Sequence, residues 1–144
     1  MGTWSETTTG VVLLPNGFRV RGQALRDRVA DENELPEFGL YLTARPHLED
    51  RWESHWVCWP DFRLPRSPTD ALATLRDAFE RSETTRVEIA CGGGTGRTGT
   101  ALAILARHAG VPAADAVAWV RTNYRARAVE TPWQRRFVAR ADVC

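Results

Sequence analysis

The segment from Cys91 to Gly99, with the sequence CGGGTGRTG, constrains the fold more than any other part of the chain. Four of the five residues between Cys91 and Arg97 are glycine, so the backbone there can adopt positive φ angles and approach a bound group closely. The residues before it, 87–90, predict a buried strand, and residues 98–109 predict a helix that a glycine ends. A strand, a glycine-rich turn and a helix N-terminus in succession predict an anion-binding loop.

The side chains at the two ends of this loop indicate what it binds. Five residues can wrap one tetrahedral anion, so the expected phosphate cradle is Arg97 together with Gly92, Gly93, Gly94, Thr95 and Gly96. The planar guanidinium of Arg97 can hold two phosphate oxygens at once. A thiol at the edge of such a loop has a lowered pKa, roughly 3.5 to 7.5, so Cys91 is the candidate nucleophile. Thr98 is placed to donate a hydrogen bond to the Cys91 sulfur.

The rest of the sequence predicts strands and helices in an order that fixes the fold class. The predicted strands are residues 11–14, 18–20, 38–42, 55–59 and 87–90. The first two flank a Pro-Asn-Gly turn and form a β-hairpin. Predicted helices start near Pro68, Thr98, Pro112 and Pro132, the last with Thr131 as its N-cap.

Alternating strands and helices predict an α/β fold with a central, mostly parallel sheet flanked by helices and an N-terminal β-hairpin. With 144 residues the chain is one domain, residues 1–144, whose polar and threonine-rich residues 1–10 are expected to be flexible. If residues 56–59 and 87–90 are parallel neighbours, the loops after them emerge at the same sheet edge. Asp61 and Cys91 should then meet in one cleft.

These motifs resemble those of the protein tyrosine and dual-specificity phosphatases. The loop matches their Cys-x5-Arg-Ser/Thr signature, and residues 59–61 (WPD) resemble the mobile loop that carries the general acid, which implies that role for Asp61. Residues 130–134 (ETPWQ) resemble the segment whose glutamine positions the hydrolytic water, which implies that role for Gln134. The family usually has histidine before the nucleophile, where this chain has Ala90.

The resemblance implies a protein tyrosine phosphatase-like fold and a phosphatase that hydrolyses phosphomonoesters, above all phosphotyrosine on protein, through a cysteinyl-phosphate. The expected substrate is a phosphoprotein or an aryl phosphate. No metal ion or other cofactor is expected, because Arg97 and the loop amides neutralise the charge. The alternative is a catalytically weak pseudophosphatase that binds phosphate without turnover, which Ala90 keeps open.

Two nucleotide-binding motifs fit the glycine-rich segment less well than the phosphatase signature does. Residues 94–99 match a dinucleotide-binding fingerprint, but a second helix follows at Pro112 where that fold needs a strand. A nucleoside-triphosphate loop would need Gly and Lys where this chain has Arg97.

Composition gives little reason to expect other partners. The net charge is +1, and all 19 basic residues are arginines interspersed with acidic residues, so no nucleic-acid partner is expected. No long apolar run predicts a membrane span. Three cysteines, an odd number with no close pair, favour a reducing, cytoplasmic location over a disulfide framework. The oligomeric state is not predicted.

Overall fold

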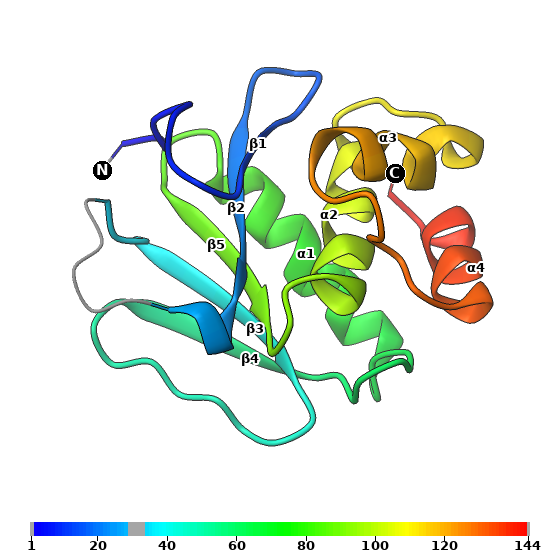
Figure 1. Ribbon diagram of the computed structural model, residues 1–144, viewed down its shortest axis with the longest axis horizontal. Helices are drawn as coiled ribbons and strands as arrows, with labels where there is room; N and C mark the ends of the chain where they lie inside the picture. The colour runs from blue at the N-terminus through cyan, green and yellow to red at the C-terminus, as the bar shows by residue number, and fades with distance from the viewer. Residues whose placement is uncertain (1, 29–33, 144) are drawn as a thin grey trace.

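The computed structural model describes residues 2–28 and 34–143, and in these residues five strands form one sheet (Figure 1). The strands are β1 (Val11–Leu13), β2 (Arg19–Ala24), β3 (Phe38–Thr43), β4 (Glu53–Cys58) and β5 (Val87–Cys91). Their order is β1-β2-β5-β3-β4. Strand β1 pairs antiparallel with β2, and the other pairs are parallel. The predicted fold class and the N-terminal hairpin are therefore confirmed.

The condition that residues 56–59 and 87–90 are neighbouring strands is not met, because β3 lies between β4 and β5. Strand β3 pairs in parallel with both, with Leu42 opposite Val57 and Tyr41 opposite Ala90. All three strands therefore point the same way. The loops that follow β4 and β5 still emerge at one edge of the sheet, so the expected convergence of the two segments does not depend on direct pairing.

Four α-helices of the described residues lie on the same side of the sheet (Figure 1). They are α1 (Pro68–Arg81), α2 (Gly96–His108), α3 (Ala116–Asn123) and α4 (Pro132–Arg140). Helix α2 is buried from Gly96 to Ala106 and packs against β5, α1, α3 and α4. The helix predicted from Pro112 starts later, because a 3-10 turn, Ala113–Asp115, precedes α3. None of these helices has both the length and the apolar character needed to cross a membrane.

Helix α4 begins with a capping box. The Thr131 hydroxyl accepts a hydrogen bond of 3.1 Å from the Gln134 backbone N–H, and Gln134 Oε1 accepts one of 3.2 Å from the Thr131 backbone N–H. Each side chain thus satisfies a backbone donor that the helix start leaves unpaired. The predicted cap is confirmed, and it fixes where the chain turns beside the edge of the sheet that carries Cys91.

The other face of the sheet carries a buried polar cluster centred on Glu88 of β5, which is fully buried. Its carboxylate contacts the guanidinium groups of Arg28 and Arg21, the latter at 3.3 Å, and accepts a 2.9 Å hydrogen bond from the Tyr41 hydroxyl. Burial and the Glu88 charge raise the pKa of Tyr41. The hydroxyl therefore remains a donor to the carboxylate at neutral pH.

The N-terminal segment is attached to the sheet through Trp4. This side chain is fully buried, and its Nε1 donates a 2.8 Å hydrogen bond to the carbonyl of Val87. The Arg21 guanidinium lies 5.0 Å from the Trp4 ring centroid. The expectation that residues 1–10 are flexible did not anticipate this anchor, because one tryptophan among polar residues shows no periodicity.

We predict that Glu88→Gln lowers the free energy of unfolding by about 3 kcal/mol, because Arg21 and Arg28 lose the carboxylate they share while the side-chain volume is kept. Urea denaturation measures the change. The control is Glu6→Gln, which removes an ion pair to Arg19 from a side chain that is 67% exposed and should cost less than about 1 kcal/mol. Equal losses in the two variants would contradict the structural importance of the Glu88 cluster.

Candidate active site

Cys91, the last residue of β5, is the centre of the site. Its side chain is buried, and its Sγ accepts hydrogen bonds from the backbone N–H of Gly94 at 3.1 Å and from the Thr98 hydroxyl at 3.0 Å. Thr98 lies in the first turn of α2, whose N-terminus carries a partial positive charge. Two hydrogen-bond donors and a helix N-terminus therefore converge on one sulfur.

The loop backbone is held from outside by the segment that follows α3. Arg125 Nη1 donates a 2.9 Å hydrogen bond to the carbonyl of Gly93, and the Tyr124 hydroxyl donates to the carbonyl of Gly94. Burial raises the pKa of Tyr124, which keeps its hydroxyl protonated as a donor. Because a peptide N–H points opposite to its C=O, fixing these carbonyls outward turns the loop amides inward. These contacts organise the loop although Ala90 precedes the cysteine.

Glycine has a structural reason at two positions of the loop. Gly94 has φ +69°, and a Cβ there would lie 2.7 Å from the backbone N of Ala24 on β2. A Cβ on Gly96 would overlap the carboxylate of Glu130. The first glycine allows the left-handed turn, and the second allows Glu130 to approach the start of α2.

Arg97 presents an anion-binding guanidinium from the first turn of α2. Its side chain is buried, and Nη1 donates a 3.1 Å hydrogen bond to the carbonyl of Trp59, which follows β4. Nε lies 3.5 Å from Oδ1 of Asp61, and no described residue accepts a hydrogen bond from it. A buried guanidinium with unused donors suits an oxyanion.

Asp61 reaches the site from the turn after β4. Its side chain is 54% exposed, and Oδ1 accepts a 3.0 Å hydrogen bond from the backbone N–H of Phe62. Phe62 has φ +60°, which is unusual for a residue with a side chain. The carboxylate is therefore presented at the mouth of the site, beside the Arg97 guanidinium.

The structure brings most of the sequence-predicted residues to one small pocket of about 180 Å³. The residues that line it are Arg26, Asp61, Phe62, Cys91, Gly93, Thr95, Gly96, Arg97 and Glu130. Gln134 does not line this pocket. It is fully buried, Oε1 caps α4, and Nε2 donates a 3.3 Å hydrogen bond to the carbonyl of Arg63. The geometry gives no support to a water-positioning role for Gln134.

The sequence analysis missed the charged pocket residues Arg26 and Glu130, as well as Phe62. Arg26 lies in a 3-10 turn after β2, and its guanidinium is 3.8 Å from where a Cβ on Gly93 would be. Burial and the neighbouring Asp61 raise the pKa of Glu130, partly offset by Arg97. The sequence held a clue only for Glu130, which is the first residue of the recognised ETPWQ segment. Arg26 reaches the pocket because β2 pairs with β5, and the sequence does not show that pairing.

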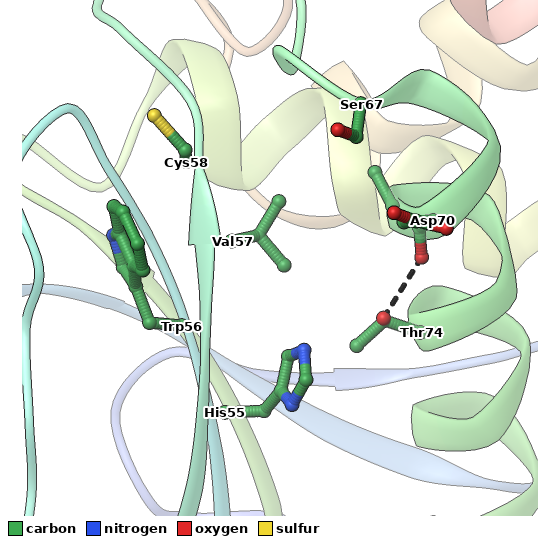
Figure 2. Close-up of a pocket in the computed structure, with 8 residues that line it drawn as sticks. His55, Trp56, Val57, Cys58, Ser67, Asp70 and Thr74 are labelled. Carbon is green, nitrogen blue, oxygen red and sulfur yellow. Dashed lines mark hydrogen bonds between the residues drawn. The ribbon is translucent and has the colours of Figure 1, made fainter.

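A second pocket lies between β4 and α1, away from this site (Figure 2). His55 and Val57 point toward α1, whereas Cys58 points away from it; the hydroxyl of Thr74 donates a 2.8 Å hydrogen bond to the carbonyl of Asp70. Among the described residues no group of three or more His, Cys, Asp and Glu side chains could hold a metal ion. The residues that line this second pocket do not combine a buried thiol, a buried guanidinium and a carboxylate as those around Cys91 do.

Cys58 is also poorly placed as a redox partner of Cys91. The two residues lie on strands separated by β3, about 10 Å apart at the usual strand spacing. Cys91 belongs to the core on the helix side of the sheet, while Cys58 points away from α1. A disulfide needs Cα atoms within about 7 Å, so this pair could form only after rearrangement. Cys144 lies outside the described residues.

Comparison with known proteins places this geometry in a family. The family model described as protein-tyrosine phosphatase matches residues 18–142. A solved structure described as the crystal structure of Tk-PTP in the active form has a TM-score of 0.66 and 26% sequence identity, over 88% of this chain and 92% of that chain. No curated protein sequence matched. Because the family match covers strands β2 to β5, the glycine-rich loop and helices α1 to α4, this chain belongs to the protein-tyrosine phosphatase family.

Proposed function

We propose that this chain hydrolyses phosphomonoesters, above all phosphotyrosine on protein, through a cysteinyl-phosphate intermediate. The family membership supports phosphatase activity in general. The observation that carries the proposal is the placement of Cys91 and the Arg97 guanidinium in one pocket, with the sulfur held by two donors. A nucleophile and an oxyanion site side by side are what phosphoryl transfer requires.

In the first step the Cys91 thiolate attacks phosphorus, an S–P bond forms, and the P–O bond to the leaving group breaks. Arg97 and the loop amides stabilise the equatorial oxygens. Asp61 gives its proton to the departing phenolate or alkoxide oxygen. Thr98 donates to the sulfur throughout, which favours its departure in the second step.

In the second step a water attacks the phosphorus of the cysteinyl-phosphate and the S–P bond breaks, which releases inorganic phosphate and the thiolate. The ionised Asp61 takes the proton of that water. The sequence resemblance gave the orienting role to Gln134. We assign it instead to the carboxylates that face the pocket, Asp61 and Glu130.

The competing function is a module that binds phosphate without turnover. The contacts of Tyr124 and Arg125 with the loop carbonyls argue against it. They fix the loop backbone through hydrogen bonds that the apolar side chain of Ala90 cannot make. Incubation with an aryl phosphate, with and without a chelator, followed by mass spectrometry of a trapped phosphocysteine, tests the choice. Turnover that survives the chelator supports the enzyme, whereas binding without turnover or trapped intermediate supports the module.

The position of Arg26 bears on which phosphorylated peptides the pocket would prefer. Its exposed guanidinium lies at the mouth of the pocket, on the loop side, and forms no ion pair with a described residue. An acidic side chain beside the phosphorylated residue would meet this charge. Within the loop itself the five residues between Cys91 and Arg97 are uncharged, which fits a single phosphate better than a polyphosphorylated headgroup.

We predict that Cys91→Ser abolishes turnover and retains phosphopeptide binding, because the cradle is the loop backbone and Arg97 while a serine hydroxyl does not ionise there. Steady-state assays and isothermal titration calorimetry with one phosphotyrosine peptide measure the two properties. Arg97→Lys is the comparison variant and should lose binding as well, because lysine cannot form the two-pronged contact. More than a trace of activity in Cys91→Ser would contradict the covalent mechanism.

We predict that Asp61→Asn lowers kcat by about 10² to 10⁴ for an alkyl or unsubstituted phenyl phosphate and much less for an activated aryl phosphate, which leaves without a proton. The dependence of kcat on leaving-group pKa measures the effect. Glu130→Gln is the matched variant, since Glu130 is the other pocket carboxyl and its raised pKa lets it keep a proton to higher pH than usual. A leaving-group effect confined to Glu130→Gln would make Glu130 the acid.

We predict a higher kcat/KM for a phosphotyrosine peptide than for a soluble polyphosphoinositide at equal ionic strength. Among the peptides, those with an acidic residue beside the phosphotyrosine should be preferred, and Arg26→Ala should remove that preference. A peptide series with aspartate or asparagine at the neighbouring positions measures it. A ratio that favours the lipid headgroup would overturn this substrate class and leave the catalytic assignments standing.

A further inference from the structure

The turn that carries Asp61 is bound to the start of α4, and this contact has no role in the mechanism described so far. We propose that Trp133 is a positioning residue that holds Asp61 over the pocket through the Phe62 carbonyl, with Gln134 as a second attachment. The inference rests on the proposed function, in which Asp61 is the proton donor. It assigns to both α4 residues an effect on catalysis that neither exerts by contact with substrate.

The first attachment is a hydrogen bond between residues 71 positions apart. Trp133 Nε1 donates to the carbonyl of Phe62 at 2.6 Å. The Trp133 side chain is 48% exposed, so burial alone does not account for a tryptophan at this position. An indole has a single N–H donor, and here that donor is used on the residue directly after Asp61.

The second attachment acts on the next peptide group. The carbonyl of Arg63 accepts hydrogen bonds from Trp59 Nε1 at 2.7 Å and from Gln134 Nε2 at 3.3 Å. The carbonyls of Phe62 and Arg63 are thus both fixed, which sets the orientation of the backbone that leaves Asp61. The donors come from both sides of the turn, namely Trp59 before it and α4 across from it.

These attachments bear on the Asp61 carboxylate through Phe62. The Phe62 N–H donates to Asp61 Oδ1, so the orientation of Phe62 directs the carboxylate, whose Oδ1 lies 3.5 Å from Arg97 Nε. Phe62 has φ +60°, a conformation that a residue with a Cβ adopts only when its surroundings hold it there. The bond from Trp133 is one contact that holds it.

Trp133 gives a cleaner test than Gln134, because Gln134 also caps α4 and its replacement would disturb the helix. Trp133→Phe keeps an aromatic ring at a half-exposed site and removes the one N–H donor. The matched control is Trp119→Phe, which makes the same change on α3, where the half-buried side chain packs against the core away from the pocket. Both variants should fold.

The experiment compares kcat for phenyl phosphate and for an activated aryl phosphate. A net hydrogen-bond contribution of typical size corresponds to about a 2- to 10-fold fall in kcat for phenyl phosphate in Trp133→Phe. We expect no more than a small change for the activated ester, and no change for either substrate in Trp119→Phe. In the double variant with Asp61→Asn, the Trp133 substitution should add no further loss, because it acts through the same proton.

Three results would overturn the inference: an unchanged kcat for phenyl phosphate in Trp133→Phe, an equal loss on both substrates, or a loss that multiplies that of Asp61→Asn. None of them would affect the proposed function, which fails only if the unmodified protein shows no Cys91-dependent turnover of either ester. The two failures are therefore distinguishable within one set of assays.

Discussion

The hydrogen bonds that converge on the Cys91 sulfur set the geometry on which the rest of the site depends. They can form only if the chain turns sharply after β5 and enters α2 within a few residues, since one donor is the backbone of Gly94 and the other is Thr98 in the first helical turn. The same turn aims the helix N-terminus and Arg97 into the pocket. A positive φ at Gly94 and the close approach of Glu130 to Gly96 follow from this path.

The sequence was sufficient to predict this segment because its signals are local. A run of glycines between a strand and a helix, with Cys91 and Arg97 at its ends, leaves few alternatives, and the α4 cap could be predicted in the same way from Thr131 followed by Pro132. What could not be predicted depends on strand order. The insertion of β3 between β4 and β5, and the arrival of Arg26 at the pocket from β2, are long-range pairings that no local pattern encodes.

Gln134 shows a different limit of sequence reasoning. A motif match suggests a role for the residue at the matching position, but it does not say which way that side chain points. Here the amide is used for capping α4 and for bonding Arg63, which leaves the pocket to the neighbouring Glu130. The motif therefore points to a residue whose hydrogen-bonding groups are already engaged in the structure.

Residues 130–134 thereby connect the stability of α4 with the placement of the Asp61 carboxylate. Thr131 and Gln134 cap the helix, Trp133 and Gln134 bond the Asp61 turn, and Glu130 faces the pocket. Any displacement of the α4 start would move all of these groups together, because they lie within five consecutive residues at that helix start. A pocket assembled from the segments after β4 and β5 and from the start of α2 is in this way bordered by an element that carries neither Cys91 nor Arg97, and the packing of α4 against α2 bears on where the Asp61 turn lies.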